Sequence, residues 1–130
     1  MGLFNTLFNS GSEAEKDSKL NWIQLSEITQ LETMISQSKI KPILLFKYST
    51  SCGISRMALK RFEREFNLPE GVIDLYFLDL LNFRAISNEI ASKFNVSHQS
   101  PQVILVKDGE VIYHNSHYSI CANKIKEIVG

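Results

Sequence analysis

Cys52 begins the segment Cys52-Gly53-Ile54-Ser55, which has the spacing of a Cys-x-x-Cys redox motif with serine in the second position. A thiolate is the nucleophile of thiol–disulfide exchange. A serine hydroxyl can hydrogen-bond a thiolate, but it cannot resolve a mixed disulfide, so a two-electron cycle within this motif is excluded. A monothiol mechanism, or resolution by a cysteine elsewhere, remains open. A free cysteine is often an inert buried residue, but the polar neighbours Ser51 and Ser55 favour a functional thiol.

The elements around Cys52 explain how its thiol could be activated. Residues 43–48 (ILLFKY) form a dense apolar run, which is typical of a strand buried on both faces. A helical pattern follows the break at 49–53, with Ile54, Met57, Ala58, Phe62 and Phe66 expected on the inward face. Cys52 therefore lies at a strand-to-helix junction, where the free N–H groups and the helix dipole stabilise a thiolate and lower its pKa.

The remaining periodicities predict a mixed α/β architecture. The early strand–helix–strand units imply parallel strands with right-handed crossovers, whereas Asp108-Gly109 predicts a two-residue antiparallel hairpin. A mixed central sheet with helices on both faces satisfies both requirements. Ser26 is the expected N-cap of the first helix. The predicted strands are 20–25, 43–48, 72–80, 102–107 and 110–114, and the predicted helices cover 28–35, 54–66, 84–94 and 119–129.

Pro101 is the second marker in the sequence, 49 residues after Cys52 and directly before a predicted strand. A cis proline there would form a tight turn that orients Ser100. From the local sequence alone, a trans proline at a strand start is the simpler interpretation. His98 could line the same cleft, although a solvated loop histidine fits equally well.

Three segments in this order resemble the thioredoxin superfamily and, more narrowly, the YtxJ family of monothiol thioredoxin-like proteins assigned to the bacillithiol system. They are Tyr48–Ser55, His98–Val103 and His114–Ile120. The resemblance covers roughly residues 20–130. It implies a thioredoxin-like fold with Pro101 in cis before the C-terminal hairpin and close to Cys52.

The resemblance also implies the chemistry. Cys52, assisted by Ser55, would remove bacillithiol or a similar low-molecular-weight thiol from S-thiolated client proteins. The small thiol is then a co-substrate, and neither a metal nor another cofactor is expected. The residues expected to contact the small thiol are Ser51, Gly53, Ser100, Pro101, Ser116 and His117.

Topology supports a ligand site near the last helix. The strand after Pro101 runs away from Cys52 and the next strand runs back, so residues 115–119 should return to the same side. The N–H groups of a helix starting there could bind a carboxylate, with Ser116, His117 and Ser119 as candidate contacts. His117 could also titrate near neutral pH and assist a leaving thiol; a surface histidine on a turn is the alternative. Cys121, expected in the first helical turn, is either a resolving thiol or buried filler.

Composition narrows the function classes. The chain of 130 residues carries 14 basic and 14 acidic side chains, and this zero balance argues against a nucleic-acid partner. Two cysteines are too few for a disulfide-dense secreted scaffold, and no run is long enough for a transmembrane helix. We therefore expect a cytoplasmic protein with an N-terminal tail and polar linker at 1–19 and a single domain at 20–130.

Two other function classes stay open at this point. The first is a non-catalytic binding module, in which the fold serves as a stress-linked scaffold. The second is a monothiol glutaredoxin-like carrier of a metal cluster, to which two subunits each contribute Cys52.

Overall fold

Strand β2 (Ile43–Tyr48) lies at the centre of the sheet, and each of its six residues is buried. In the computed structural model, which describes residues 20–51 and 53–130, five strands lie in the order β1-β3-β2-β4-β5. The other elements are β1 (Trp22–Gln24), α2 (Thr29–Gln37), α3 (Gly53–Glu65), β3 (Asp74–Asp79), α4 (Arg84–Phe94), β4 (Gln102–Lys107), β5 (Glu110–Ser116), the 3-10 turn η3 (His117–Ser119) and α5 (Ala122–Val129).

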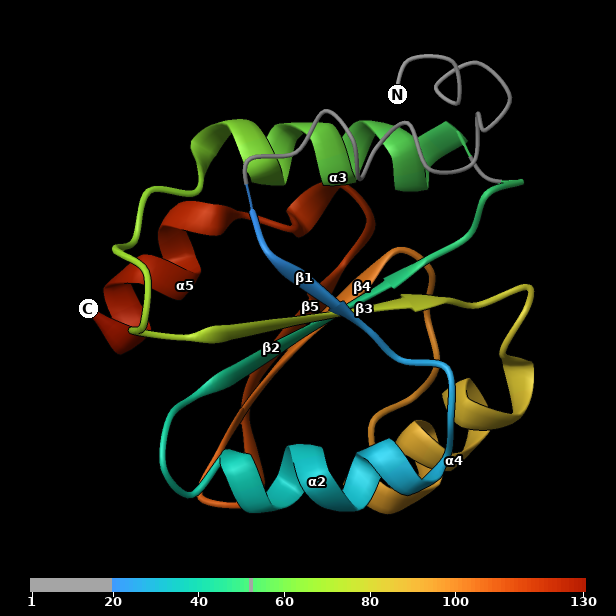
Figure 1. Cartoon of the computed structure of the whole chain (residues 1–130). Coiled ribbons are helices and arrows are strands. Elements are labelled where there is room, and N and C mark those ends of the chain that lie inside the picture. The colour runs from blue at the N-terminus through green and yellow to red at the C-terminus, as the bar shows by residue number, and fades with distance from the viewer. Residues whose placement is uncertain (1–19, 52) are drawn as a thin grey trace, which may run out of the picture.

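The sheet is mixed, as predicted. β1 and β2 both pair with β3 in parallel, whereas β4 pairs antiparallel with β2 and with β5. Helices α3 and α5 cover one face, and α2 and α4 cover the other (Figure 1). This arrangement confirms the thioredoxin-like α/β architecture expected from the sequence.

Two hydrophobic clusters hold these layers together. On the α3/α5 face, the ring of Phe46 on β2 lies between Phe62 and Phe77, with centroid separations of 5.8 Å and 6.5 Å. On the α2/α4 face, Leu45 packs with Met34 and Ile90. Because strand side chains alternate between faces, β2 supplies both clusters, which explains its apolar run.

The β4–β5 turn has the conformation that its sequence predicts. Asp108 and Gly109 both have positive φ, 54° and 80°, as a tight two-residue hairpin turn requires. The buried Ser38 at the end of α2 secures this turn, because its carbonyl accepts a bond from Asp108 N (2.8 Å) and its hydroxyl accepts one from Gly109 N (2.9 Å).

Three local predictions were wrong. Ser26 is not the N-cap of α2; the Gln30 side chain accepts bonds from the N–H groups of Ser26 and Glu27 (2.7 and 2.9 Å) and organises the helix entrance from inside. Met57 does not face the core: its side chain is 62% exposed, and Leu59 (1%) takes the inward position. The last helix starts at Ala122, three residues after the predicted start, because η3 precedes it.

Other boundaries differ by one or two residues. β3 is shorter than the predicted 72–80, and β5 extends two residues past the predicted end at His114. The predicted tail and linker at 1–19 lie outside the described residues. No helix within 20–51 and 53–130 is long and apolar enough to cross a membrane.

Candidate functional site

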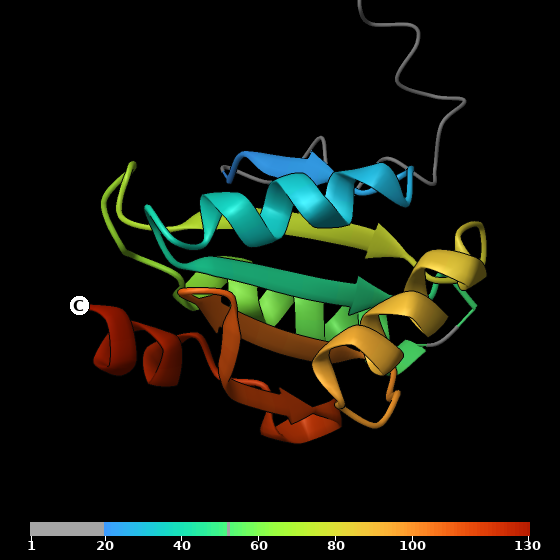
Figure 2. The same ribbon diagram turned by 90° about the horizontal axis from the view of Figure 1, so that it is seen from below.

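The Cys-x-x-Ser segment lies where β2 gives way to α3. Cys52 itself is outside the described residues, but its neighbours are not: Ser51 is exposed, and Gly53 is the exposed first residue of α3. Figure 2 shows the arrowheads of β2 and β3 on the same side of the molecule, where α3 and α4 begin. The uncompensated N–H groups of α3 therefore lie at the sheet end to which Cys52 is joined.

Ser55 is the buried part of this segment. Its side chain is 0% exposed, and its hydroxyl oxygen accepts a hydrogen bond from Ser49 N over 3.2 Å. Ser49 Oγ lies 3.1 Å from Ser51 Oγ, which adds a second polar contact to the same turn. A hydroxyl that accepts a bond still has its own hydrogen to donate, so Ser55 retains a donor for a nearby anion.

Pro101 lies beside two of the expected ligand residues. The Ser100–Pro101 peptide bond is cis. The buried Pro101 precedes β4, Gln102 pairs with Ser116 across the hairpin, and Pro101 O accepts a bond from His117 N (3.0 Å). The structure thus brings Pro101, Ser116 and His117 together. His117 has a positive φ of 55°, which turns the chain out of β5 into η3.

The loop before Pro101 is fastened to both β4 and α4. Gln102 Nε2 donates to Ser97 O (3.0 Å), and Gln102 Oε1 accepts a long bond from Gln99 N (3.4 Å). His98 Nδ1 lies 3.2 Å from Ser87 Oγ of α4. Burial first, and then the positive charges of Lys47 and Arg84, hold the pKa of His98 below its usual 6.5. His98 is therefore an anchored loop residue in a cationic setting.

Lys47 was not singled out from the sequence, because it stands in an otherwise apolar run. Its side chain is 0% exposed, and burial lowers its pKa from 10.5 to about 8. The signal was present: a lysine inside a strand buried on both faces has to bury its amine. Its charge acts on His98, three residues before Pro101.

A small apolar hollow separates α3 from η3. Ile54, Met57 and Ala58 line one side of it, and His117 and Tyr118 line the other. Arg61 closes it by donating from Nη2 to Ile120 O (2.7 Å). The half-buried His117 therefore faces α3 and does not stand alone on a surface turn.

Cys121 and Ser119 occupy positions other than those predicted. Cys121 is a half-buried free thiol at the N-cap position of α5, one residue before the first turn. Ser119 is exposed in η3, not at the start of the last helix. Ser119 thus lies two residues before the N-cap of that helix. Ser100 is half-buried, and its hydroxyl oxygen is buried with no partner among the described residues.

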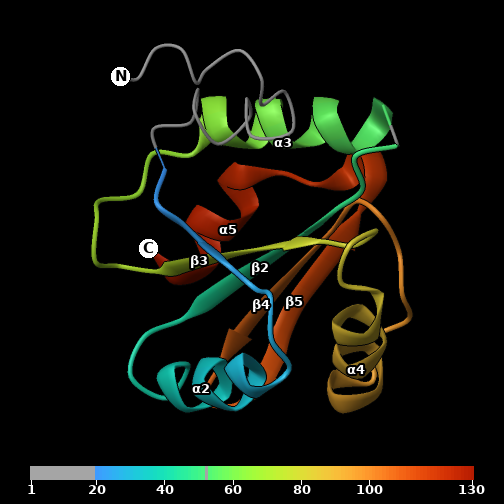
Figure 3. The ribbon, with the colours of Figure 1, turned by 45° about the vertical axis from the view of Figure 1, so that its right-hand side comes forward.

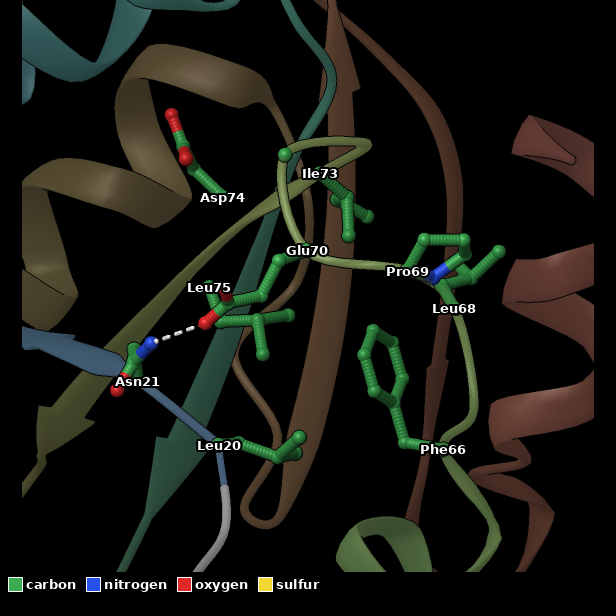
Figure 4. Close-up of a pocket in the computed structure, with 10 residues that line it drawn as sticks. Leu20, Asn21, Phe66, Leu68, Pro69, Glu70, Ile73, Asp74 and Leu75 are labelled. Carbon is green, nitrogen blue, oxygen red and sulfur yellow. Dashed lines mark hydrogen bonds between the residues drawn. The ribbon is translucent and has the colours of Figure 1, made fainter.

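A cavity of about 370 Å³ lies at the opposite end of the sheet (Figure 4). Phe66, Leu68 and Leu75 give it an apolar lining, and Asn21 Nδ2 bridges to Glu70 Oε2 over 2.9 Å at its rim. It adjoins the starts of β1 and β3, away from the sheet end where β2 stops. None of the candidate site residues that the structure describes lines it.

Known proteins share this fold and part of this sequence. Residues 23–125 match the family model described as monothiol bacilliredoxin BrxC. A solved structure whose description proposes an oxidoreductase with a thioredoxin fold is 33% identical, over 81% of this chain and 90% of that one, with a TM-score of 0.69. The thioredoxins of Malassezia sympodialis and Trypanosoma brucei brucei are both 18% identical. They cover 86% and 84% of this chain and 90% and 91% of their own, with TM-scores of 0.63 and 0.64, and they show the fold alone.

Proposed function

The chain belongs to the monothiol bacilliredoxin family BrxC, and from this membership we propose that Cys52 removes bacillithiol from S-thiolated proteins. The observation that carries the proposal is the extent of the family match, which spans both the Cys-x-x-Ser segment and the Ser100-Pro101 turn. The narrower YtxJ assignment belongs to the same proposal. The family match and the thioredoxin fold support a thiol-redox role in general.

The reaction has two balanced steps. In the first, the Cys52 thiolate attacks the bacillithiol sulfur of a mixed disulfide. The client sulfur leaves as a thiolate that takes up a proton from water, and Cys52 now carries bacillithiol. In the second, the thiolate of a free bacillithiol attacks that sulfur, which releases the symmetrical bacillithiol disulfide and restores the Cys52 thiolate.

The surrounding residues have roles that their positions support. The hydroxyl hydrogen of Ser55 is available to the Cys52 thiolate, while Ser51 and Gly53 flank the thiol in the chain. In this proposal the small thiol contacts Ser116 and His117, which strand pairing and a hydrogen bond join to the buried Pro101, and Ser100 adds a buried hydroxyl beside Pro101. Cys121 is the candidate resolving thiol: its attack on the Cys52 sulfur would form a Cys52–Cys121 disulfide and release bacillithiol as a thiolate, although the reaction needs no second protein thiol.

Intact-protein mass spectrometry tests this function. Wild type, Cys52→Ser and Cys121→Ser are each incubated with bacillithiol disulfide and, separately, with glutathione disulfide. We expect wild type and Cys121→Ser to gain one bacillithiol and little glutathione, and Cys52→Ser to gain none. Equal or absent modification by both disulfides would contradict the bacillithiol assignment. Unchanged modification of Cys52→Ser would remove Cys52 from the mechanism.

A client assay completes the test. A bacillithiol-modified protein is mixed with each variant, and release of its free thiol is followed over time. Wild type should release the client thiol, and Cys52→Ser should not. Slower turnover but normal first release by Cys121→Ser would assign the resolving role to Cys121. A non-catalytic module would release nothing, and a cluster carrier would contain iron as purified.

A further inference from the structure

Lys47 occupies an unusual place in the sheet. It is the penultimate residue of β2 and lies opposite Leu78 of β3 and Gln102 of β4. Strand alternation places it on the same face as Leu45, which is the face covered by α2 and α4. Its side chain is fully buried. A cationic side chain is therefore buried in the protein interior directly across from Gln102, the residue that follows Pro101.

The Lys47 ammonium is not neutralised by the residues around it. Within residues 20–51 and 53–130, Lys47 Nζ has no hydrogen-bond partner and joins no ion pair. Buried charges in proteins are almost always paired, because an unpaired one costs several kcal/mol. Lys47 therefore destabilises the fold, and a destabilising buried charge is a candidate functional residue.

The charged side chains at this sheet end include both signs. Its charge and that of Arg84 on α4 both act on His98 in the loop before Pro101. The acid at this sheet end is Asp79, whose Oδ2 accepts a bond from Asn82 while Oδ1 is buried without a partner in the described part of the chain. The N-terminus of α3 adds partial positive charge at the same end (Figure 3).

Two other described residues at this end of the sheet also have unpartnered polar atoms. Among the residues that the structure describes, three buried side-chain atoms have no hydrogen-bond partner: Lys47 Nζ, Asp79 Oδ1 and Ser100 Oγ. All three belong to the sheet end where β2 and β3 stop and β4 starts. A buried polar atom without an internal partner calls for an explanation such as a catalytic role or a bound water.

We propose that the Lys47 ammonium stabilises the Cys52 thiolate through its electric field, which makes Lys47 a positioning residue for thiol exchange. Cys52 follows Lys47 by five residues, so their Cα atoms lie at most about 18 Å apart. A field that passes through poorly solvated protein is screened much less than one between surface charges. The proposal rests on Cys52 being the reactive thiol of the proposed function.

The pH dependence of Cys52 alkylation tests this role. Lys47→Met removes the charge and keeps an unbranched apolar chain, and Lys47→Leu provides a second neutral variant. Lys41→Met is the matched control, because Lys41 precedes the other end of β2 and pairs on the surface with Asp74 (3.2 Å). All are made in the Cys121→Ser background, so that iodoacetamide reports on one thiol.

The alkylation midpoint of Cys52 should rise by about one pH unit in both Lys47 variants and stay unchanged in Lys41→Met. The difference should persist in about 0.5 M salt, since a buried charge is poorly screened. Midpoints that move by less than about 0.2 pH unit, or equally in the control, overturn the proposal. The assay contains no small thiol. Its result can therefore be interpreted even if bacillithiol is not the substrate.

Stability separates this role from a structural one. A neutral residue at position 47 removes an unpaired buried charge, so the Lys47 variants should melt at a higher temperature than wild type. A structural lysine would show the reverse, with a lower melting temperature and an unchanged alkylation midpoint.

Discussion

The backbone N–H of Ser49 donates a hydrogen bond to Ser55 Oγ over 3.2 Å, and this contact links the end of β2 to the first turn of α3. The two residues lie on either side of Cys52 in the sequence. Ser55 therefore stabilises the turn in addition to being the second position of the Cys-x-x-Ser segment. Mutation can measure the stabilising role separately from any role in thiol chemistry.

Ser55→Ala leaves the buried Ser49 N–H without an acceptor. We expect the free energy of unfolding to fall by about 1–3 kcal/mol, measured by urea denaturation with the fluorescence of Trp22. Ser51→Ala is the control, because Ser51 is exposed and its loss should cost under about 0.5 kcal/mol. Equal effects of the two substitutions would contradict the role of this contact.

The stability of the protein should rise between about pH 8 and pH 10.5 because of Lys47. Burial lowers its pKa from the ordinary lysine value of 10.5, which the unfolded chain retains, to about 8 in the folded protein. Below pH 8 both states carry the proton, and the folded state bears the full cost of the buried charge. Between the two values only the unfolded chain stays protonated, so deprotonation favours folding, by at most about 3 kcal/mol.

The difference between wild type and Lys47→Met isolates this contribution from other groups. Denaturation at a series of pH values should show Lys47→Met more stable below pH 8, with the gap closing by about pH 10.5. A constant gap across this range would mean that Lys47 does not titrate as described.

His98 should report the charge of Lys47 directly. Burial, Lys47 and Arg84 together hold the His98 pKa below 6.5. In Lys47→Met the electrostatic contribution of Lys47 disappears, so the His98 pKa should rise toward its ordinary value. Proton NMR titration of the imidazole measures this, with His114, which is exposed on β5, as the internal reference. A His98 pKa that is the same in wild type and Lys47→Met would show that the charge of Lys47 does not act on the loop.

Arg61 should control the position of η3 against α3. Its guanidinium donates to Ile120 O over 2.7 Å, and a bond to a charged donor contributes about 1.5–3 kcal/mol. Arg61→Met should therefore speed amide exchange of His117, whose N–H bonds to Pro101 O. Arg64→Met, an exposed neighbour on α3, should leave that exchange rate unchanged.

The elements with strong apolar patterns were predictable from the sequence. β2, α4 and β4 have the predicted bounds, because six or more residues with one dominant period decide each of them. The entrance of α2 was not predictable in the same way: a serine at position 26 matches the usual N-cap, but the glutamine at position 30 reaches back to the same N–H groups. Propensity at a single residue cannot anticipate such a competing side chain.

The candidate site was predictable in its parts more than in its arrangement. The Asp108-Gly109 turn predicts the hairpin but not its full register: continued from Lys107–Glu110, the pairing would place Gln102 opposite Asn115. A bulge at Leu105/Val106 shifts the register by one residue and brings Gln102 opposite Ser116. The η3 turn at His117–Ser119 has no period of its own, so the start of α5 was misplaced. Lys47 was missed because a strand buried on both faces has no alternation of polar and apolar residues. The sequence pattern therefore does not indicate the face to which Lys47 points.

The cavity bounded by Phe66, Leu68 and Leu75 has a practical consequence for chemical probes. It has apolar walls with polar side chains at its rim, a volume of about 370 Å³, and a position remote from the sheet end that leads to Cys52. A ligand bound there would occupy the sheet end opposite the one where β2 stops, so its affinity alone would not report on thiol exchange. A search for inhibitors should therefore select for electrophiles that react with the thiol. Ligands of the far cavity could instead carry a label or a solid support without blocking thiol exchange.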